Sequence, residues 1–377
     1  MKGVHAVAGT IGFIILNCMS VLPAWAQVHK QADVPLRVVV AGISHGHASW
    51  IYGLKATADI EVLGIYERNT ELAEVYRKRF GLDKTLFYTD MEAMLDQLKP
   101  QAALAFNPTS EHLDVVKACA PRGIHVMVEK PLATTVKDAL EMQTLAKKYK
   151  IHLLTNYETS WYPTTTKSFE LVTDSNFIGA MKKVIFHTGH SGARNTEQHK
   201  YFFSWLTDPV KNGGGAITDF GCYGANMMTY LSKGEIPASV SAITRQFKPD
   251  IYPNVDDEAT IIVSYATAQC IIQASWNWPF NRKDMWIYGD RGYIIASNDT
   301  SLEVRNNDTK KSLVLQIARE DVNVYGNPFS YFADVIRGKL EVPVYGTYSL
   351  ENNVTVVRIL EAARQSAASG RVVYLKK

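Results

Sequence analysis

The sequence has few cysteines, little net charge and no repeated or low-complexity tract. Once a leader peptide is removed three cysteines remain, Cys119, Cys222 and Cys270. They cannot all pair, and their spacing fits no zinc site, so we expect buried free thiols. Removing Lys2, the only charged residue of residues 1–26, lowers the formal charge from +3 to +2. So small a charge gives no basic field, and we therefore expect no nucleic-acid partner.

Only the amino end carries a long apolar run. Lys2 precedes the apolar stretch 6–22, and Ala24-Trp25-Ala26 follows it as a small-x-small cleavage site. This arrangement predicts a signal peptide over residues 1–26, with cleavage after Ala26 and no membrane anchor in the mature chain. There is no twin arginine, and Cys18 lacks the small residue that precedes a lipoprotein cysteine. We therefore expect the general secretory route and a periplasmic or secreted protein.

After a polar lead-in, residues 27–35, apolar strands alternate with helical stretches, as is typical of α/β domains. A strand over 36–40 runs into a turn, and a helix is expected over 48–56. Such a strand, turn and helix cradles phosphate groups in dinucleotide-binding folds. The glycine fingerprint is incomplete, because a serine takes the second glycine position and the last glycine falls one residue early. The residues predicted to meet the pyrophosphate are Gly42, Ser44, His45 and Gly46.

Polar groups also follow the next two long strands. The strand over 60–66 ends at Glu67, about where an acidic side chain meets the adenine ribose hydroxyls. A carboxylate there repels a 2′-phosphate, so NAD is favoured, while the neighbouring Arg68 keeps NADP open as an alternative. The strand over 102–106 leads into a proline-marked polar loop, whose predicted cofactor contacts are Asn107, Pro108 and His112.

A third strand end carries a carboxylate and an ammonium. The apolar run 124–128 is followed by Glu129-Lys130-Pro131. Ligands of parallel sheets collect outside the carboxyl ends of strands, so this pair is expected to face the cofactor. A surface ion pair is the alternative reading. A further helix and strand close the predicted Rossmann domain, residues 36–155.

Residues 156–377 change character and predict an α+β domain. Strands separated by glycine and polar turns replace the alternation of strand and helix, and the flat sheet face is available for a partner subunit. The expected strands are 182–188, 238–245, 258–265, 269–276, 284–289 and 292–296.

A glycine-rich segment, Asn212 to Gly215, precedes a helix with a polar stripe. Asp219, Tyr223 and Asn226 recur at i, i+4 and i+7 and therefore share one face of that helix. Apolar neighbours predict that the helix is buried, and a buried polar stripe needs partners.

The order of these motifs resembles the glucose-fructose oxidoreductase/inositol dehydrogenase/MocA family over nearly all of the mature chain. The resemblance implies a Rossmann domain followed by a larger domain with an open, mostly antiparallel sheet. It also implies that Lys130 touches both nicotinamide and substrate, often next to a cis Lys-Pro bond. Many members carry His where Tyr223 stands. The tyrosine looks like the branch with glucose-fructose oxidoreductase, anhydrofructose reductase and dihydrodiol dehydrogenase.

Charge suggests the roles of the reactive groups. Tyr223 is predicted to accept or donate the substrate proton, because an ammonium such as Lys130 would lower the pKa of its phenol and polarise the substrate oxygen. Asp219 is expected to orient Lys130 or sugar hydroxyls. The family's arginine is missing near the domain junction, where Glu158 and Trp161 stand instead. The predicted sugar contacts are Tyr157, Trp161, Tyr162, His190, Asn226 and Trp276.

No metal site is expected, since neither His45-x-His47 nor His187-x-x-His190 comes with a carboxylate-rich third set of ligands. Three functions compete. The leading one is an exported NAD(P)-dependent oxidoreductase acting on a sugar, polyol or glycoside, working as a homo-oligomer through the second sheet. The second is a glycosidase or lyase that oxidises its sugar transiently and recycles a tightly held cofactor, and the third is a non-catalytic carbohydrate-binding protein. Free NAD is scarce outside the cytoplasm, so tight cofactor binding is expected in either enzyme.

Overall fold

The computed structural model describes residues 34–53, 59–173, 175–196 and 199–375. The predicted signal peptide and most of the lead-in lie outside the described residues, and the account below concerns the unit from Pro35 onward. No helix in this part of the chain is both long and apolar enough to cross a membrane.

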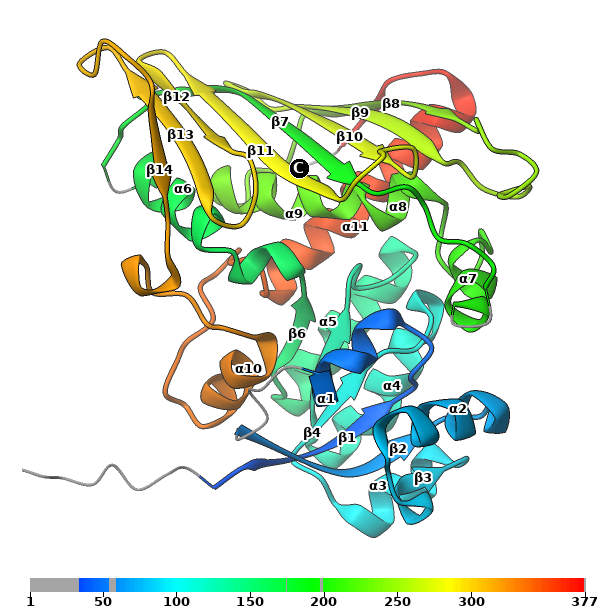
Figure 1. Ribbon diagram of the computed structural model, residues 1–377. Coiled ribbons are helices and arrows are strands. Elements are labelled where there is room, and N and C mark those ends of the chain that lie inside the picture. Colours follow the sequence, from blue (N-terminus) through cyan, green and yellow to red (C-terminus); the bar gives the residue numbers. More distant parts are fainter. Residues whose placement is uncertain (1–33, 54–58, 174, 197–198, 376–377) are drawn as a thin grey trace, which may run out of the picture. The chain divides into compact units, whose positions relative to one another are not determined.

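The first half forms a parallel sheet of six strands in the order β3-β2-β1-β4-β5-β6 (Figure 1). All of its strand pairs are parallel. This is the order of doubly wound dinucleotide-binding sheets, in which the crevice for the ligand opens where the order reverses, between β1 and β4. The strands are β1 (Leu36–Ala41), β2 (Ile60–Tyr66), β3 (Phe87–Tyr88), β4 (Ala102–Ala105), β5 (His125–Glu129) and β6 (Leu153–Asn156).

Most helices of this half begin and end at residues suited to these positions. The Asn69 side chain accepts from two backbone N–H groups at the start of α2, and Gly81 ends that helix in the left-handed conformation. The helices are η1 (Gly46–Ser49), α1 (Trp50–Gly53), α2 (Thr70–Phe80), η3 (Lys84–Leu86), α3 (Met91–Leu98), η4 (Thr109–Glu111), α4 (His112–Cys119), η5 (Ala120–Arg122) and α5 (Val136–Tyr149).

The second half forms a nine-stranded sheet in the order β14-β13-β12-β11-β7-β10-β9-β8-β15. Among its strand pairs in the described residues only β7 and β10 are parallel, so the expected open, mostly antiparallel sheet is confirmed. The strands are β7 (Met181–Gly189), β8 (Ser239–Arg245), β9 (Glu258–Ser264), β10 (Gln269–Ser275), β11 (Arg282–Gly289), β12 (Gly292–Ala296), β13 (Ser301–Asn306), β14 (Leu313–Gln316) and β15 (Val373–Tyr374).

Helices cover one face of this sheet, as Figure 1 shows for α6, α8, α9 and α11. Every second residue of β9 is buried, which fits a sheet with one covered face. The helices of this half are η6 (Glu158–Trp161), α6 (Pro163–Thr173), α7 (Lys200–Leu206), α8 (Ala216–Asp219), α9 (Gly221–Leu231), η7 (Arg319–Asp321), α10 (Pro328–Ile336) and α11 (Leu350–Ser369).

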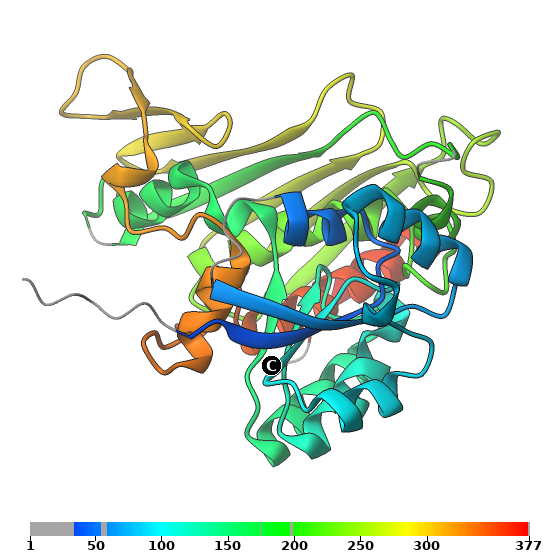
Figure 2. The same cartoon turned by 60° about the horizontal axis from the view of Figure 1, so that its bottom comes forward.

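The C-terminal segment returns to the first sheet. Phe329 and Phe332 of α10 belong to the apolar core that also contains Leu36 and Ile65 of β1 and β2. Figure 2 shows α10 beside these two strands. The three cysteines within the described residues are free and buried, as expected.

Candidate active site

A cavity of about 200 Å³ lies at the carboxyl ends of β1, β2 and β4. Six of the residues predicted to bind the cofactor line it: Gly42, Ser44, Glu67, Arg68, Asn107 and Pro108. We refer to it as the nucleotide cavity. Residues of α7 and the loop after it add a wall that the sequence did not reveal: Tyr201, Ser204, Trp205 and Lys211.

Gly42 has a positive φ of 77°, and a Cβ there would lie 2.6 Å from the Cβ of Asn107. Only glycine allows the β1 turn and the β4 loop to approach this closely. This is the tight turn that the first glycine of a dinucleotide fingerprint provides.

Several polar atoms of the nucleotide cavity are buried without a hydrogen-bond partner, among them Ser44 Oγ, Asn107 Oδ1 and Trp205 Nε1. Buried polar atoms are usually satisfied, so these atoms fit a site that exchanges hydrogen bonds with a polar ligand. Glu67 is held in place, because Oε2 accepts from the Ile43 N–H at 3.1 Å and Oε1 from the Asn69 N–H at 2.9 Å. The cavity therefore fits the adenosine part of a dinucleotide.

Three further predicted contacts lie elsewhere. His45 is buried against the rings of Phe202 and Trp205, and Gly46 opens η1 on the surface. His112 is buried at the start of α4, where its Nδ1 donates to the Leu132 carbonyl at 3.1 Å. Burial lowers its pKa to about 4. In this structure His112 holds the loop after Pro131 and does not line the nucleotide cavity.

The two halves of the chain meet at Lys130. The Lys130-Pro131 bond is cis, and the amine donates to Asp219 Oδ1 at 2.5 Å and to the Asp219 carbonyl at 3.0 Å. Both side chains are almost completely buried. Trp276 Nε1 donates to the other carboxylate oxygen of Asp219 at 2.9 Å. We call Lys130, Asp219, Trp276 and Tyr223 the reactive cluster.

The predicted helix through Asp219 and Tyr223 is not continuous, which corrects the expectation of one polar face. α8 ends at Asp219 and α9 starts at Gly221, with Phe220 between them at φ −108° and ψ −25°. Because of this break the Asp219 carbonyl accepts from Lys130. Gly215 permits the entry into α8, since a Cβ there would clash with the Asp256 carbonyl oxygen.

Electrostatics keep the buried pair charged. Burial alone would raise the pKa of Asp219, but Lys130, His190 and the bond from Trp276 outweigh it and hold that pKa at about 2. Burial would likewise lower the pKa of Lys130, but Asp219 outweighs it and the pKa is raised. The pair is therefore ionised at neutral pH.

Tyr223 lies beside Lys130 as predicted, but the pKa of its phenol is shifted in the opposite direction from the prediction. Its side chain is 1% exposed, and the Lys130 and Lys283 amines stand 5.1 and 5.5 Å from its ring centroid. Burial, and then the nearby carboxylate of Glu158, raise the pKa of the phenol well above its ordinary value. The expectation of a lowered pKa is wrong, because burial dominates and the nearby carboxylates act in the same direction.

Lys283 of β11 was missed by the sequence reasoning, since a lysine in a strand carries no motif. Its amine pairs with Glu158 at 2.8 Å, and Glu158 also accepts from the Tyr162 hydroxyl at 2.6 Å. Lys283 of β11 thus places a cation at the domain junction, where the resemblance implies an arginine that this sequence lacks.

Two of the remaining predicted sugar contacts are partly buried, and two are completely buried. Trp161 packs edge-on against Trp50, and His190 is partly buried against Phe220. Tyr157 is completely buried with its ring edge-on to Tyr223, and Trp276 is equally buried, so neither ring offers a face to a sugar in this structure.

Asn226 was predicted to contact sugar, but its amide group joins segments of the protein instead. Its amide donates to the Thr347 carbonyl at 2.8 Å and to Asn352 Oδ1 at 2.9 Å. Both amide hydrogens are thereby used in joining α9 to α11 and to the loop before it, and Asn226 has a structural role here.

The sequence predicted that neither histidine pair has a carboxylate ligand nearby, and this is wrong for the first pair. Glu129 Oε2 lies 3.1 Å from His47 Nδ1, so the first histidine pair does have a carboxylate beside it. Potential ligand atoms of His45, His47 and Glu129 all lie within 4.8 Å of one another. The second pair is engaged otherwise, because His187 contacts Asp284 at 2.8 Å.

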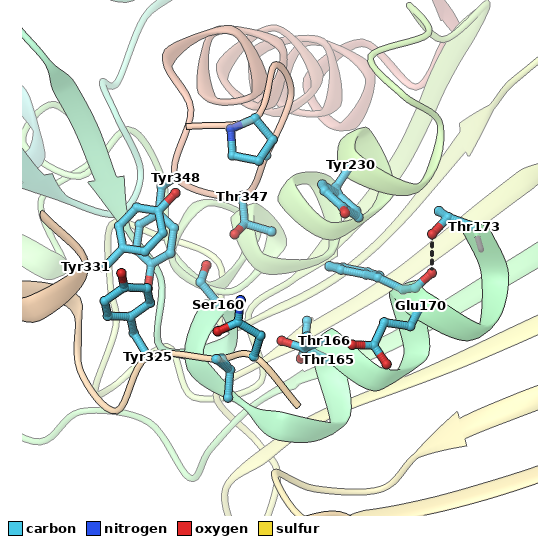
Figure 3. Close-up of a pocket in the computed structure, with 15 residues that line it drawn as sticks. Ser160, Thr165, Thr166, Glu170, Thr173, Tyr230, Tyr325, Tyr331, Thr347 and Tyr348 are labelled. Atoms are coloured by element: carbon cyan, nitrogen blue, oxygen red, sulfur yellow. Dashed lines mark hydrogen bonds between the residues drawn. The ribbon is translucent and has the colours of Figure 1, made fainter. Parts of the chain in front are cut away.

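A separate cavity of about 230 Å³ lies between α6 and the segment 323–348 (Figure 3). Tyr325, Tyr331 and Tyr348 gather on one side of it, the last two with stacked rings 4.2 Å apart. Ser160 of η6 lines it, whereas Glu158 of the same short helix contacts Lys283. None of the residues predicted to bind cofactor or sugar lines this cavity.

Comparison with protein families gives two matches. Residues 36–157 match the model of an oxidoreductase family with an NAD-binding Rossmann fold, and residues 170–295 match the model of the GFO/IDH/MocA C-terminal domain. Among named relatives, the chain is 24% identical to trans-1,2-dihydrobenzene-1,2-diol dehydrogenase of Xenopus tropicalis, over 81% of this chain and 90% of the relative.

Solved structures share the fold. The chain superposes on aldose-aldose oxidoreductase from Caulobacter crescentus, complexed with glycerol, with a TM-score of 0.75 at 20% identity, covering 90% of this chain and all of the other. It superposes on an inositol dehydrogenase homologue from Azotobacter vinelandii, complexed with NAD+, with a TM-score of 0.76 at 16% identity, covering 92% and 99% of the two chains.

Proposed function

The chain belongs to the GFO/IDH/MocA family of oxidoreductases, and from this premise we propose an exported, NAD(P)-dependent enzyme acting on sugars, polyols or glycosides. It transfers hydride between the nicotinamide and a hydroxyl or carbonyl carbon of the substrate. The polyhydroxylated compounds in the names of its relatives support the substrate class.

One observation carries the proposal: the buried contact between Lys130 and Asp219. It joins the carboxyl end of β5, where a dinucleotide fold presents its reactive end, to the first helix after the glycine-rich segment of the second half. Tyr223 lies within the same group of side chains. A lysine, a carboxylate and a phenol from separate segments thus meet beside the predicted cofactor.

The nucleotide cavity would hold the adenosine end of the cofactor through Glu67, Ser44 and Asn107. A carboxylate at the end of β2 favours the free ribose hydroxyls of NAD over the 2′-phosphate of NADP. When bound, the cofactor supplies the hydride acceptor or donor. Tight binding is part of the proposal, because an exported enzyme has little free nucleotide to draw on.

Lys130 is placed to hold the substrate oxygen. An ammonium has three donors, and two of them go to the Asp219 carboxylate and carbonyl. The third is available to the hydroxyl or carbonyl oxygen of the substrate, where the positive charge stabilises developing negative charge. Asp219 orients the amine and does not itself need to touch the sugar.

Tyr223 is assigned the proton transfer. Its raised pKa keeps the phenol protonated before turnover, so it acts as the proton donor when a carbonyl is reduced. In the reverse direction the phenolate left by that donation takes the proton from the substrate hydroxyl.

We further propose that two copies of the chain associate through the sheet face that α6, α8, α9 and α11 leave uncovered.

The test has two parts. Heat-denatured, purified protein is expected to release about one NAD or NADP per chain. Glycosides and free sugars are then added to native protein, and the absorbance of the reduced cofactor is followed. Net accumulation supports the oxidoreductase, whereas product release without accumulation supports the cofactor-recycling glycosidase or lyase. Sugar binding without any nucleotide in the preparation would leave only a binding protein.

Tyr223→Phe separates the roles within the cluster. We expect hydride transfer to fall by about 10²–10⁴-fold, the usual contribution of a positioned acid or base. A near-normal rate would mean that Lys130 or a water molecule carries the proton.

A further inference from the structure

Two imidazoles and a carboxylate meet at the carboxyl ends of β1 and β5. His45 and His47 come from the turn after β1, and Glu129 is the last residue of β5. Among the residues that the structure describes, this is the only group of three or more His, Cys, Asp or Glu side chains with ligand atoms close enough to share a metal ion. Its two histidines lie in the stretch where the glycine fingerprint is incomplete.

The carboxylate is fixed in a way that suits a metal ligand. Glu129 Oε1 accepts from Asn156 Nδ2 at 2.7 Å, which leaves Oε2 directed at His47, 3.1 Å from Nδ1. Two donors bound to one zinc ion at about 2.1 Å in tetrahedral geometry are about 3.4 Å apart, so this pair needs little movement. Asn156 would then be the outer partner that orients a ligating carboxylate.

The charges around the group also favour a cation. The nearby Lys130 ammonium is balanced by Asp219, and Lys283 is balanced by Glu158. Glu129 itself is buried and has no lysine or arginine partner among the ion pairs of the described residues. Of the carboxylates in this group, Glu129 is therefore the one whose charge no lysine or arginine balances.

Two existing contacts must be given up. The hydrogen bond between His47 Nδ1 and Glu129 Oε2 loses its proton when both atoms bind the ion. His45 Nδ1 now accepts from the His47 backbone N–H at 3.1 Å, and coordination through either ring nitrogen ends that bond. Two hydrogen bonds are worth little beside metal–ligand bonds, so these losses do not prevent binding.

We propose that His45, His47 and Glu129 bind one divalent transition-metal ion of the zinc type. Neutral imidazoles and a carboxylate suit Zn²⁺ and Co²⁺, and three protein ligands leave a coordination position open, as in catalytic zinc sites. None of the three residues lines the nucleotide cavity, so the site lies apart from the pocket proposed for adenosine.

The test uses untagged, chelator-treated protein without nucleotide. Titration with Co²⁺ is followed by visible absorption, and Zn²⁺ is then added as a competitor, with metal content measured after equilibrium dialysis. We expect one Co²⁺ per chain, displaced by Zn²⁺, and an affinity at least about 100-fold lower in His47→Asn and in Glu129→Gln. Asn156→Ala is expected to weaken binding by about 10–100-fold.

His125→Asn is the matched control. His125 and His152 form another adjacent pair, with ring centroids 5.0 Å apart, but belong to no three-ligand group of the described residues. This variant should bind Co²⁺ as the wild type does. His47 is partly exposed, so His47→Asn tests the site even if Glu129→Gln fails to fold. No bound Co²⁺, or Co²⁺ binding that survives in His47→Asn, would overturn the proposal. Release of nucleotide from denatured protein is measured separately and decides only the proposed function.

Discussion

The nucleotide cavity and the reactive cluster satisfy their polar groups in opposite ways. In the cavity, Ser44 Oγ and Asn107 Oδ1 are buried without a protein partner. In the cluster, both carboxylate oxygens of Asp219 and its carbonyl accept hydrogen bonds from within the protein. One region keeps its hydrogen-bonding capacity for a ligand, and the other uses nearly all of it to fix its own geometry.

This difference has a physical consequence. A group that waits for a ligand contributes to binding and little to folding, because folding leaves it unsatisfied. A pre-organised charged group contributes to both, because its partners hold it in place before the substrate arrives. Substitutions in the cluster should therefore lower stability and activity together, and removal of an unpartnered cavity group such as the Ser44 hydroxyl should lower affinity alone.

The largest effect is expected for Lys130→Met. Removing one partner of a buried ion pair leaves Asp219 charged and unpaired, which costs about 3–5 kcal/mol of the free energy of unfolding. Activity should fall by about 10²–10³-fold, as for the loss of one donor to a charged transition state. Denaturant unfolding and steady-state kinetics measure the two effects.

The double variant Lys130→Met/Asp219→Asn provides the control. It removes the unpaired charge, so most of the lost stability should return while activity stays low. If Lys130→Met alone costs less than about 1 kcal/mol, the pair is not the pre-organised element described here.

Trp276→Phe should have the next largest effect. The change removes the donor to Asp219 Oδ2, and a hydrogen bond to a charged group is worth about 1.5–3 kcal/mol. Trp205→Phe is a matched control from the other region, because that indole is also buried but its Nε1 has no hydrogen-bond partner. The difference between the two free energies of unfolding isolates the hydrogen bond. Equal values would show that only ring volume matters at Trp276.

The free energy of unfolding should depend on pH in the acid range because of Asp219 in the reactive cluster. The pKa of Asp219 is about 2 in the folded protein, below the ordinary value of 3.8, so its stabilisation is complete above about pH 4. As the pH falls from about 4 to about 2, protonation of Asp219 should lower the free energy of unfolding by about 2 kcal/mol. A tenfold difference in proton affinity between the folded and unfolded chains corresponds to about 1.4 kcal/mol. Urea unfolding between about pH 5 and pH 2 should show this loss in the wild type and not in Asp219→Asn.

The fold of the first half could be predicted from its sequence because each element has a local cause. The alternation of buried strands and helices indicated the class, and local residues mark both ends of α2, with Asn69 before it and Gly81 after it. Three α-helices of the second half were not predicted: α6, α7 and α10. α10 is stabilised by Phe329 and Phe332, which pack on β1 and β2, elements from the opposite end of the chain, and no local pattern reports that contact.

The candidate site was predicted in part for the same reason. Lys130, Asp219 and Tyr223 could be named from motifs, and the structure brings them together. The pKa of Tyr223 could not be foreseen, because it depends first on burial and then on the nearby Glu158 carboxylate. Lys283 and the approach of His47 to Glu129 were missed, since both depend on pairs of residues far apart in sequence.

The smallest effect on stability, and the sharpest test of the comparison, is expected for Ser44→Ala. The hydroxyl has no protein partner, so the free energy of unfolding without nucleotide should stay within about 0.5 kcal/mol of the wild type. Affinity for NAD should fall about tenfold, corresponding to one hydrogen bond of about 1.4 kcal/mol. Ser349→Ala should do the opposite, because this serine caps α11 by accepting from the Asn352 N–H, and loss of a cap costs about 1 kcal/mol. Calorimetric titration with NAD and urea unfolding of both variants would complete the comparison. If Ser44→Ala destabilised the nucleotide-free protein as much as Ser349→Ala does, the cavity would be a structural element like the cluster, and the contrast between the two regions would be wrong.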